Sequence, residues 1–326
     1  QSHEHTGDTA DSRTDGTKSD TDGDGIKDSA DPEPFSYTIT DRTLALVQGL
    51  SYTNLEAYVG LTVGEIMDQV EFKNLSKENA QCLSSAYIVY ANNSDSGYWG
   101  DFWDSGLGSI ALRFQRFGKK DAVVYSLRGT EFETDLANDG VADLILGVGW
   151  DCEQSRIAFN EYRSLATNRN VDYYITGHSL GGRLALDVMY KIHNANEEGF
   201  LKKSANIPVP VHAATFNGLG YNGLVYASLE NDVINTYKDK LTNYYYRFDL
   251  VGEGFGVTGV YVRPGRNVEL LCKDKTGNTL RSNEELSRII GFRDFKYHGI
   301  RYFGDDYDLL PDSSHSFAYW IEPKNS

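Results

Sequence analysis

The stretch ITGHSLGGRLAL, residues 175–186, places a serine between glycines at the junction of two apolar segments. The preceding run VDYYIT, residues 171–176, is rich in β-branched and aromatic residues and predicts a strand. The following run LGGRLALDVMYKIH, residues 180–193, predicts a helix. Ser179 therefore lies in a G-x-S-x-G pentapeptide between a strand and a helix, which predicts a nucleophile elbow with an exposed serine hydroxyl.

Strand and helix patterns alternate through the rest of the chain. Two strands are expected around the Gly-Lys-Lys turn of residues 109–130, and further strands over 209–216 and 243–248. Helices are expected over residues 41–58, 77–90, 152–168 and 222–240. Strands that alternate with helices imply crossover connections, so the expected fold class is α/β with a mainly parallel central sheet flanked by helices.

Composition narrows the function classes. A chain of 326 residues with 40% hydrophobic content can bury one large domain with a small appendage. The net charge of −16, without clustered Lys or Arg, argues against a nucleic-acid partner. No apolar run approaches the roughly 20 residues of a transmembrane helix, and the start at Gln1 suggests a product trimmed of its targeting segment. The three cysteines, Cys82, Cys152 and Cys272, are expected to be buried small hydrophobes.

A serine nucleophile needs a histidine base, and in this type of fold the chain order is Ser, then Asp or Glu, then His. Four histidines follow Ser179 along the chain. His193 falls in a predicted helix and His212 in a predicted strand, so both are expected to be structural. Of His298 and His315, the polar loop in PDSSHSFAYW makes His315 the favoured base.

The acid of the triad is expected just beyond the end of a strand that follows residues 209–216. YYYRFDLVGEGFG supplies Asp249 directly after an apolar-aromatic run and before a glycine-rich loop. Asp249 is therefore the candidate that orients the histidine.

Four motifs together resemble the fungal-type class 3 lipases, a family with the α/β-hydrolase fold. They are TGHSLGG, LRGT at residues 127–130, FDLV and HSFAYW, and they occur in the family's order over roughly residues 105–322. The resemblance implies a serine esterase that cleaves acyl glycerolipids through an acyl-enzyme, without a catalytic metal. It also implies an oxyanion hole formed by the backbone N–H and hydroxyl of Thr130 and the backbone N–H of Leu180. Such donors favour the transition state because negative charge develops on the carbonyl oxygen.

The segment EFETDLANDGVADLILGVGW, residues 131–150, stands where many such lipases carry an amphipathic lid. Its first half is acidic and polar, so a triglyceride preference is not implied and phospholipid is an equal expectation. The aromatic-rich residues 97–108 and the insertion 253–310 are candidates to line or cover an acyl site.

The segment DTDGDGIKDSAD, residues 20–31, has acidic residues at positions one, three, five, nine and twelve, and a glycine at position six. This spacing predicts a Ca²⁺ loop, with the backbone carbonyl of the residue at position seven as a further ligand. The expected ligands are Asp20, Asp22, Asp24, Ile26, Asp28 and Asp31. The loop resembles thrombospondin type 3 repeats but departs from the EF-hand, which has a Glu at position twelve. The resemblance implies a structural calcium ion and a secreted or extracellular bacterial protein.

Three parts of the chain follow from these patterns. Residues 1–19 are expected to be a flexible leader, since Ala10 is their only hydrophobic residue. Residues 20–34 would form the calcium repeat and linker, and residues 35–326 the hydrolase domain. The expected partner is a lipid or phospholipid substrate, and a membrane surface is one place where the protein would meet it. Two other readings stay open: an inactive hydrolase fold that serves as a calcium-dependent binding or adhesion module, and an acyltransferase or peptidase on the same fold.

Overall fold

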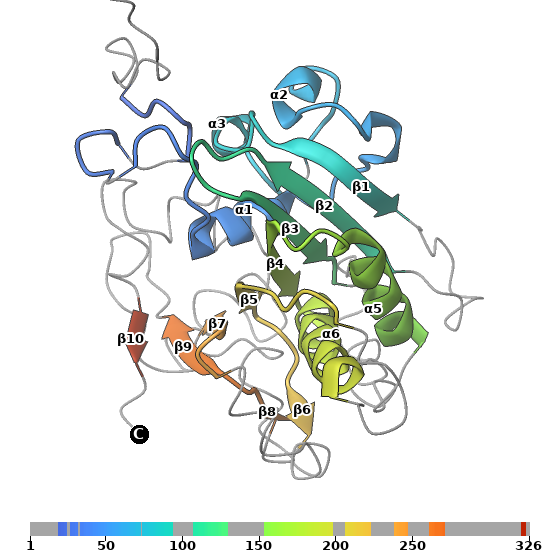
Figure 1. Ribbon diagram of the computed structural model, residues 1–326. Helices are drawn as coiled ribbons and strands as arrows, with labels where there is room; N and C mark the ends of the chain where they lie inside the picture. Colours follow the sequence, from blue (N-terminus) through green and yellow to red (C-terminus); the bar gives the residue numbers. More distant parts are fainter. Residues whose placement is uncertain are drawn as a thin grey trace, which may run out of the picture.

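The computed structural model of this chain describes residues 19–24, 27–31, 33–72, 74–93, 107–129, 153–197, 206–222, 238–246, 261–270 and 321–323. An eight-stranded sheet runs through this part of the chain in the order β1-β2-β3-β4-β5-β7-β9-β10 (Figure 1). Neighbouring strands are parallel from β3 to β9 and antiparallel at both edges. The strands are β1 (Tyr87–Asn93), β2 (Gly108–Phe114), β3 (Asp121–Leu127), β4 (Val171–His178), β5 (His212–Phe216), β7 (Leu241–Tyr246), β9 (Arg266–Leu270) and β10 (Ile321–Pro323). A separate two-stranded sheet pairs β6 (Tyr221–Asn222) with β8 (Tyr261–Val262).

Helices cover both faces of the central sheet (Figure 1). One face carries α1 (Asp41–Leu50), and near it lie η1 (Glu56–Tyr58), α2 (Val63–Ile66) and α3 (Lys77–Gln81). The other face carries α5 (Glu153–Leu165) and α6 (Leu180–Glu197). Within β3, Val124 packs into the core on the α1 side, whereas Val123 and Tyr125 pack into the core on the α6 side. This alternation follows from the two-residue period of a strand, and the resulting three layers confirm the expected α/β fold.

Helix α1 is the most deeply buried element on its face. It begins after Thr40, whose side chain accepts a hydrogen bond from the Thr43 amide, while the Thr43 side chain accepts one from the Thr40 amide. Every residue from Thr43 to Leu50 is buried. This fixed helix packs against β3 and β4, so the residues at its C-terminal end are held close to the ends of those strands.

Most of the expected elements are present, and two helix predictions were wrong in part. The helix expected over residues 77–90 ends at Gln81, and β1 begins at Tyr87 because the β-branched and aromatic run YIVY pairs with β2 at the sheet edge. The helix expected over residues 41–58 ends at Leu50, where the sequence continues with the poor helix formers Ser, Tyr, Thr and Asn. Most of the helix expected over residues 222–240 lies outside the described residues.

Two general expectations concern the membrane and the cysteines. Among the described residues, none of the helices combines the length and the apolar character needed to cross a membrane. Cys82 is a free thiol and only partly buried, with the Arg42 guanidinium 3.8 Å from its sulfur. Cys152 and Cys272 lie outside the described residues.

Candidate active site

Ser179 lies in the turn between the end of β4 and the start of α6. Its φ of 56° is in the left-handed region, which costs a residue with a side chain about 1–2 kcal/mol. Three backbone hydrogen bonds of 3.1 Å hold the turn: the Ser179 amide donates to the Phe216 carbonyl, and the Gly182 and Leu219 amides donate to the Ser179 carbonyl. The strained conformation is thus fixed by the end of β5 and by the segment that follows it.

The two flanking glycines are required by close backbone contacts. A Cβ on Gly177 would lie 2.1 Å from the Gly181 carbonyl oxygen, and a Cβ on Gly181 would lie 2.0 Å from the Leu127 carbonyl oxygen. No larger residue fits at either place without moving the backbone. The G-x-S-x-G pattern therefore brings the ends of β3 and β4 and the start of α6 into direct contact.

The sequence predicted an exposed Ser179 hydroxyl, and this was wrong: the hydroxyl is buried, because the segment after β3 packs against the elbow. The residue is 1% exposed, and within the part of the chain that the structure describes its Oγ has no hydrogen-bond partner. A buried hydroxyl without a partner costs free energy and is rare, so it is typical of a group retained for function. Helix α6 begins at Leu180, so the positive end of the helix dipole lies beside this hydroxyl.

The segment that follows β3 packs directly against the elbow. A Cβ on Gly129 would lie 2.6 Å from the His178 carbonyl oxygen and 2.8 Å from the Ser179 Cβ. Arg128 holds this segment from the other side, because its amide donates to the Gly108 carbonyl at 2.8 Å and its guanidinium donates to Asn93 Oδ1 at 2.7 Å. The expected oxyanion strand therefore ends in contact with the predicted nucleophile.

The remaining predicted active-site residues divide into two groups. Leu180 is the first residue of α6 and is adjacent to Ser179 in the chain. The structure therefore brings together Ser179, Leu180 and the end of β3, whereas Thr130, Asp249, His298 and His315 lie outside the described residues.

The two histidines expected to be structural lie within described elements. His193 is partly buried in α6. His212 starts β5, and its Nε2 lies 2.7 Å from Asp41 Oδ1. The opposite end of β5, at Phe216, is the end that contacts Ser179, so His212 lies away from the elbow.

Two residues near the elbow were missed by sequence reasoning. Gln48 of α1 is fully buried, donates to the Leu127 carbonyl at 3.1 Å and accepts from the Ser126 hydroxyl at 2.8 Å. Tyr52 has its hydroxyl 2.6 Å from His178 Nδ1. A glutamine within the apolar run LALVQGL is a signal that could have drawn attention to Gln48, whereas nothing local distinguishes Tyr52.

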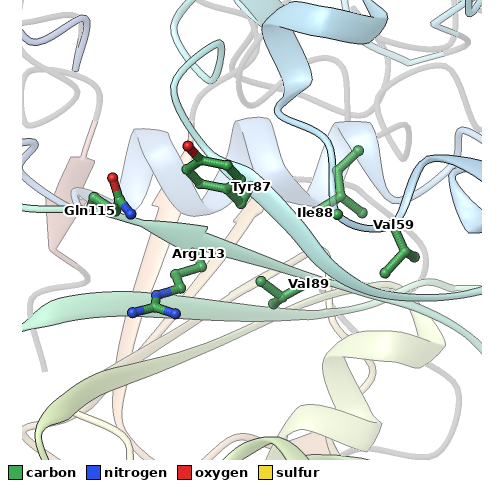
Figure 2. Close-up of a pocket in the computed structure, with 7 residues that line it drawn as sticks. Val59, Tyr87, Ile88, Val89, Arg113 and Gln115 are labelled. Atoms are coloured by element: carbon green, nitrogen blue, oxygen red, sulfur yellow. The ribbon is translucent and has the colours of Figure 1, made fainter.

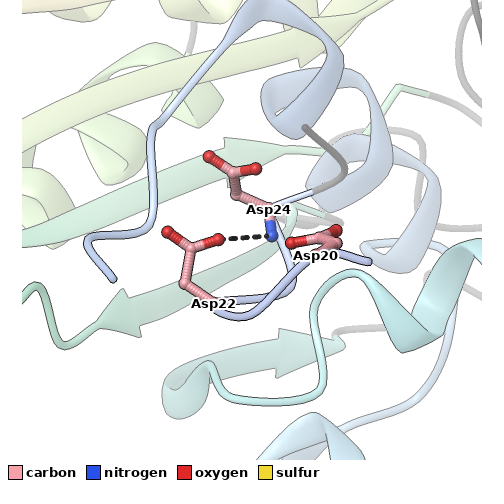
Figure 3. Close-up of side chains that lie close together, drawn as sticks. All are labelled: Asp20, Asp22 and Asp24. Atoms are coloured by element: carbon pink, nitrogen blue, oxygen red, sulfur yellow. Dashed lines mark hydrogen bonds between the residues drawn. The ribbon is translucent and has the colours of Figure 1, made fainter. Parts of the chain in front are cut away.

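The N-terminal acidic segment folds back on itself and gathers carboxylates. Asp20, Asp22 and Asp24 each have a carboxylate oxygen within 4.8 Å of the others (Figure 3). The Asp24 amide donates to Asp22 Oδ1 at 3.1 Å, and the Gly23 amide donates to Asp20 Oδ1 at 2.8 Å. Burial, with the nearby Asp24 charge, raises the pKa of Asp22 to about 7. Three of the predicted calcium ligands are thus close together.

The other predicted ligands are arranged differently. Asp28 directs both carboxylate oxygens to Thr21, accepting from its amide at 2.7 Å and from its hydroxyl at 2.8 Å. Asp31 is 8% exposed, and burial raises the pKa of its carboxyl group, with Asp20 and Asp28 adding to the effect. Ile26 lies outside the described residues.

One oxygen each of Asp22 and Asp31 is buried and, among the described residues, has no hydrogen-bond partner. Buried polar atoms normally have hydrogen-bond partners. Carboxylate oxygens that lie close together without hydrogen-bond donors are the ligands that a hard cation such as Ca²⁺ prefers. The donor set of this acidic loop therefore fits a calcium ion.

The acidic loop contacts the domain that follows it. Asp24 is 4% exposed, and its Oδ2 accepts a hydrogen bond of 3.0 Å from the Thr38 amide, just before α1. Glu33 forms an ion pair with Lys119 in the turn between β2 and β3. The loop is thus packed against the same elements that lead to the elbow.

An open pocket of about 430 Å³ lies elsewhere on the molecule (Figure 2). It is lined by Val59, Gly60, Tyr87, Ile88, Val89, Arg113 and Gln115. Tyr87 pairs with Arg113 near one end of β2, whereas the end of β3 that contacts the elbow pairs with the other end of β2. Of the described candidates, neither Ser179 nor Leu180 lines this pocket, so it is separate from the elbow.

Comparison with known proteins gives similar folds only. No protein-family model and no curated protein sequence matches the chain. The triacylglyceride lipase of Rhizomucor miehei is 14% identical, with a TM-score of 0.46 over 80% of this chain and 94% of that chain. Lipase II from Rhizopus niveus is 14% identical, with a TM-score of 0.42 over 80% of this chain and 94% of that chain. A fungal lipase-inhibitor complex is 16% identical, with a TM-score of 0.45 over 82% and 95%. At these values the similarity assigns neither site residues nor a substrate to this chain.

Proposed function

We propose that the protein is a secreted serine carboxylester hydrolase, a lipase or an A-type phospholipase, that cleaves acyl esters of glycerolipids. The geometry of Ser179 carries this proposal. Ser179 is held at a φ of 56° between a strand and a helix, and its buried hydroxyl has no hydrogen-bond partner among the described residues, which are the features of an elbow nucleophile. The ordered motifs LRGT, TGHSLGG, FDLV and HSFAYW supply the other proposed catalytic groups.

In the proposed reaction, Ser179 Oγ attacks the ester carbonyl carbon while His315 accepts the serine proton. The tetrahedral intermediate collapses as the ester C–O bond breaks, and His315 gives the proton to the leaving alcohol. A water molecule then attacks the acyl-enzyme, again losing its proton to His315, and the fatty acid leaves as Ser179 regains its proton. Asp249 would hold the imidazole in the orientation and tautomer that this sequence requires.

Charge on the carbonyl oxygen would be stabilised by donors on both sides of Ser179. The Leu180 amide comes from the start of α6, and Thr130 follows Gly129, whose backbone packs against the Ser179 Cβ. Fixed donors of this kind act mainly on the transition state, because the ground-state ester carries little charge on its oxygen. The contact between the end of β3 and the elbow supports this arrangement.

Calcium is proposed as a structural ion of the N-terminal acidic loop. Asp20, Asp22 and Asp24 would hold the ion together with Asp31, and the buried Asp31 oxygen that has no hydrogen-bond partner among the described residues supports the assignment. The carbonyl of Ile26 and the carboxylate of Asp28 complete the proposed set, although Asp28 also accepts two hydrogen bonds from Thr21. The ion would neutralise the negative charge of these carboxylates. The proposed ester hydrolysis itself needs no metal. Extracellular calcium loops bind with a Kd of roughly 10⁻⁴ to 10⁻³ M and are filled where calcium is millimolar, so the proposed loop supports an extracellular setting.

The substrate class is tested by hydrolysis of esters of increasing chain length, of triglycerides and of phospholipid vesicles, with the released acyl position determined. A lipase or phospholipase releases fatty acid from at least one glycerolipid, and Ser179→Ala abolishes the release. Failure to hydrolyse any ester, with calcium-dependent binding retained, would favour the binding module. Transfer of the acyl group to an added alcohol in place of water, or cleavage of peptides alone, would favour the acyltransferase or the peptidase.

A further inference from the structure

We propose that Tyr52 is a positioning residue that joins the oxyanion strand to the nucleophile elbow through its hydroxyl. The inference rests on the proposed ester hydrolysis and assigns this reaction a residue that lies outside the triad and the oxyanion hole. Tyr52 follows the C-cap of α1 and is 5% exposed, so it belongs to the buried structure beneath the elbow.

The Tyr52 hydroxyl contacts both elements. The Gly129 amide donates to this hydroxyl at 3.3 Å, and the hydroxyl oxygen lies 2.6 Å from His178 Nδ1. The hydroxyl oxygen therefore accepts from Gly129 and shares a second hydrogen bond with His178 Nδ1, in which the tautomer of the imidazole decides which group donates.

The two partners are the chain neighbours of the proposed reacting groups. Gly129 precedes Thr130, the proposed oxyanion donor, and His178 precedes Ser179, the proposed nucleophile. The backbones already touch here, since a Cβ on Gly129 would lie 2.8 Å from the Ser179 Cβ. Oxyanion donors act only when they are held within about 0.5 Å of the productive position. One hydroxyl that fixes both neighbours therefore sets the separation of donor and nucleophile.

Helix α1 gives Tyr52 a rigid support. Four residues earlier in the chain, Gln48 donates to the Leu127 carbonyl and accepts from the Ser126 hydroxyl, so the same helix also clamps the last residues of β3. Gln48 in α1 and Tyr52 just beyond its C-cap thus hold the end of β3 and the segment after it at two places. Only the Tyr52 contact also reaches the elbow.

A matched control lies near the other end of α1. Tyr37 is 3% exposed, and its hydroxyl donates to the Cys82 carbonyl at 2.8 Å, away from the elbow. Tyr37→Phe and Tyr52→Phe each remove one buried hydroxyl from the same side of the sheet. The melting temperature of both variants shows how much of any loss comes from stability alone.

The test measures kcat and KM on a short soluble ester. Tyr52→Phe is expected to lower kcat about tenfold with KM within about twofold, because misplaced donors weaken the transition state more than the bound ester. Tyr37→Phe should keep kcat within about twofold. Wild-type kcat in Tyr52→Phe, or an equal loss in Tyr37→Phe at equal melting temperature, would overturn the inference.

A double-mutant cycle keeps the test sharp if Tyr52→Phe is poorly stable. His178→Asn removes the imidazole from the other side of the contact, and the double variant should be no slower than the slower single variant, because both changes break one unit. Losses in kcat that multiply would show independent effects and contradict a shared contact. Activity in Ser179→Ala would instead overturn the proposed function itself, so the two failures are distinguishable.

Discussion

The amide of Ser179 donates a hydrogen bond to the carbonyl of Phe216, 3.1 Å away. This contact ties the turn after β4 to the last residue of β5, so the left-handed Ser179 is held by tertiary structure. A turn fixed in this way keeps its shape when the serine side chain is shortened. Loss of activity on changing the hydroxyl therefore reports on chemistry rather than on folding.

The base and the acid are tested by three single variants. His315→Ala is expected to lose roughly as much activity as Ser179→Ala, because the members of a triad act as a unit. His298→Ala should retain nearly full activity, and Asp249→Asn should lose most of it because the imidazole is no longer oriented. Steady-state kinetics on a soluble ester checks all three. The reverse pattern for the two histidines would reassign the base, and an active Asp249→Asn would reassign the acid.

The oxyanion donors are tested at Thr130. Thr130→Val keeps the shape and the backbone amide but removes the hydroxyl donor, and the loss of one such donor typically lowers kcat ~10²- to 10³-fold. KM should change little, because the charged oxygen exists only near the transition state. If the variant changes KM alone, Thr130 contacts the substrate without stabilising the oxyanion.

The layer between β1, β2, β3 and α5 is held by one carboxylate. Glu161 accepts hydrogen bonds from the Tyr90 hydroxyl at 2.7 Å and the Asn92 side-chain Nδ2 at 2.9 Å on one oxygen. Its other oxygen accepts from the Ser109 and Tyr125 hydroxyls, both at 2.7 Å. Glu161→Ala removes the charged acceptor of these four hydrogen bonds, so the free energy of unfolding should fall by about 2–3 kcal/mol.

Denaturant unfolding measures this loss, and Glu153→Ala is the control on the same helix. The Glu153 side chain is 52% exposed and pairs with Arg156, so its removal should change the unfolding free energy by no more than about 0.5 kcal/mol. Equal effects of the two variants would show that the four contacts to Glu161 contribute little.

Calcium should stabilise the acidic loop and leave the chemistry unchanged. With a Kd of roughly 10⁻⁴ to 10⁻³ M, ~1 mM calcium contributes only about 0.4 to 1.4 kcal/mol through mass action. The Asp22→Asn variant should lose this calcium-dependent rise in stability. Adding a chelator to the wild type should abolish the same rise. Asp68→Asn, at an exposed ion pair with Lys77, should keep it. Proteolysis near Asp20 should become faster without calcium.

Hydrolysis of a short soluble ester tests whether calcium leaves the chemistry unchanged. A chelator, or deletion of residues 1–31, should leave turnover nearly intact, because the proposed reaction uses no metal. The deletion should lower thermal stability slightly, because it removes the hydrogen bond between the Thr38 amide and Asp24. If a chelator abolished turnover in the truncated protein, a second metal site near the triad would be required.

The elbow could be predicted from sequence because its cause is local. Gly177 and Gly181 stand where neighbouring backbones leave no room for a Cβ, and the flanking apolar runs form the strand and the helix expected of them. The acidic loop was likewise predictable in part, since spacing alone brings Asp20, Asp22 and Asp24 together.

Contacts between distant parts of the chain could not be predicted in this way. Tyr52 and Gly129 are 77 residues apart, and nothing in either local pattern indicates that they meet. The first part of β1, residues 87–90, was expected to be helical because its spacing is ambiguous, and pairing with β2 at the sheet edge decides its structure. Strands β9 and β10 were also missed, because they are short and gain their hydrogen bonds from partners far along the chain.

The central claim, that Ser179 is the nucleophile, is tested most directly by covalent labelling with a serine-directed organophosphonate, followed by peptide mass spectrometry. The account predicts a single adduct on the peptide that contains Ser179, formed in parallel with the loss of esterase activity. Ser179→Ala should be folded, inactive and unlabelled. Wild-type-like turnover in Ser179→Ala, or an activity-linked adduct on another residue, would contradict the account.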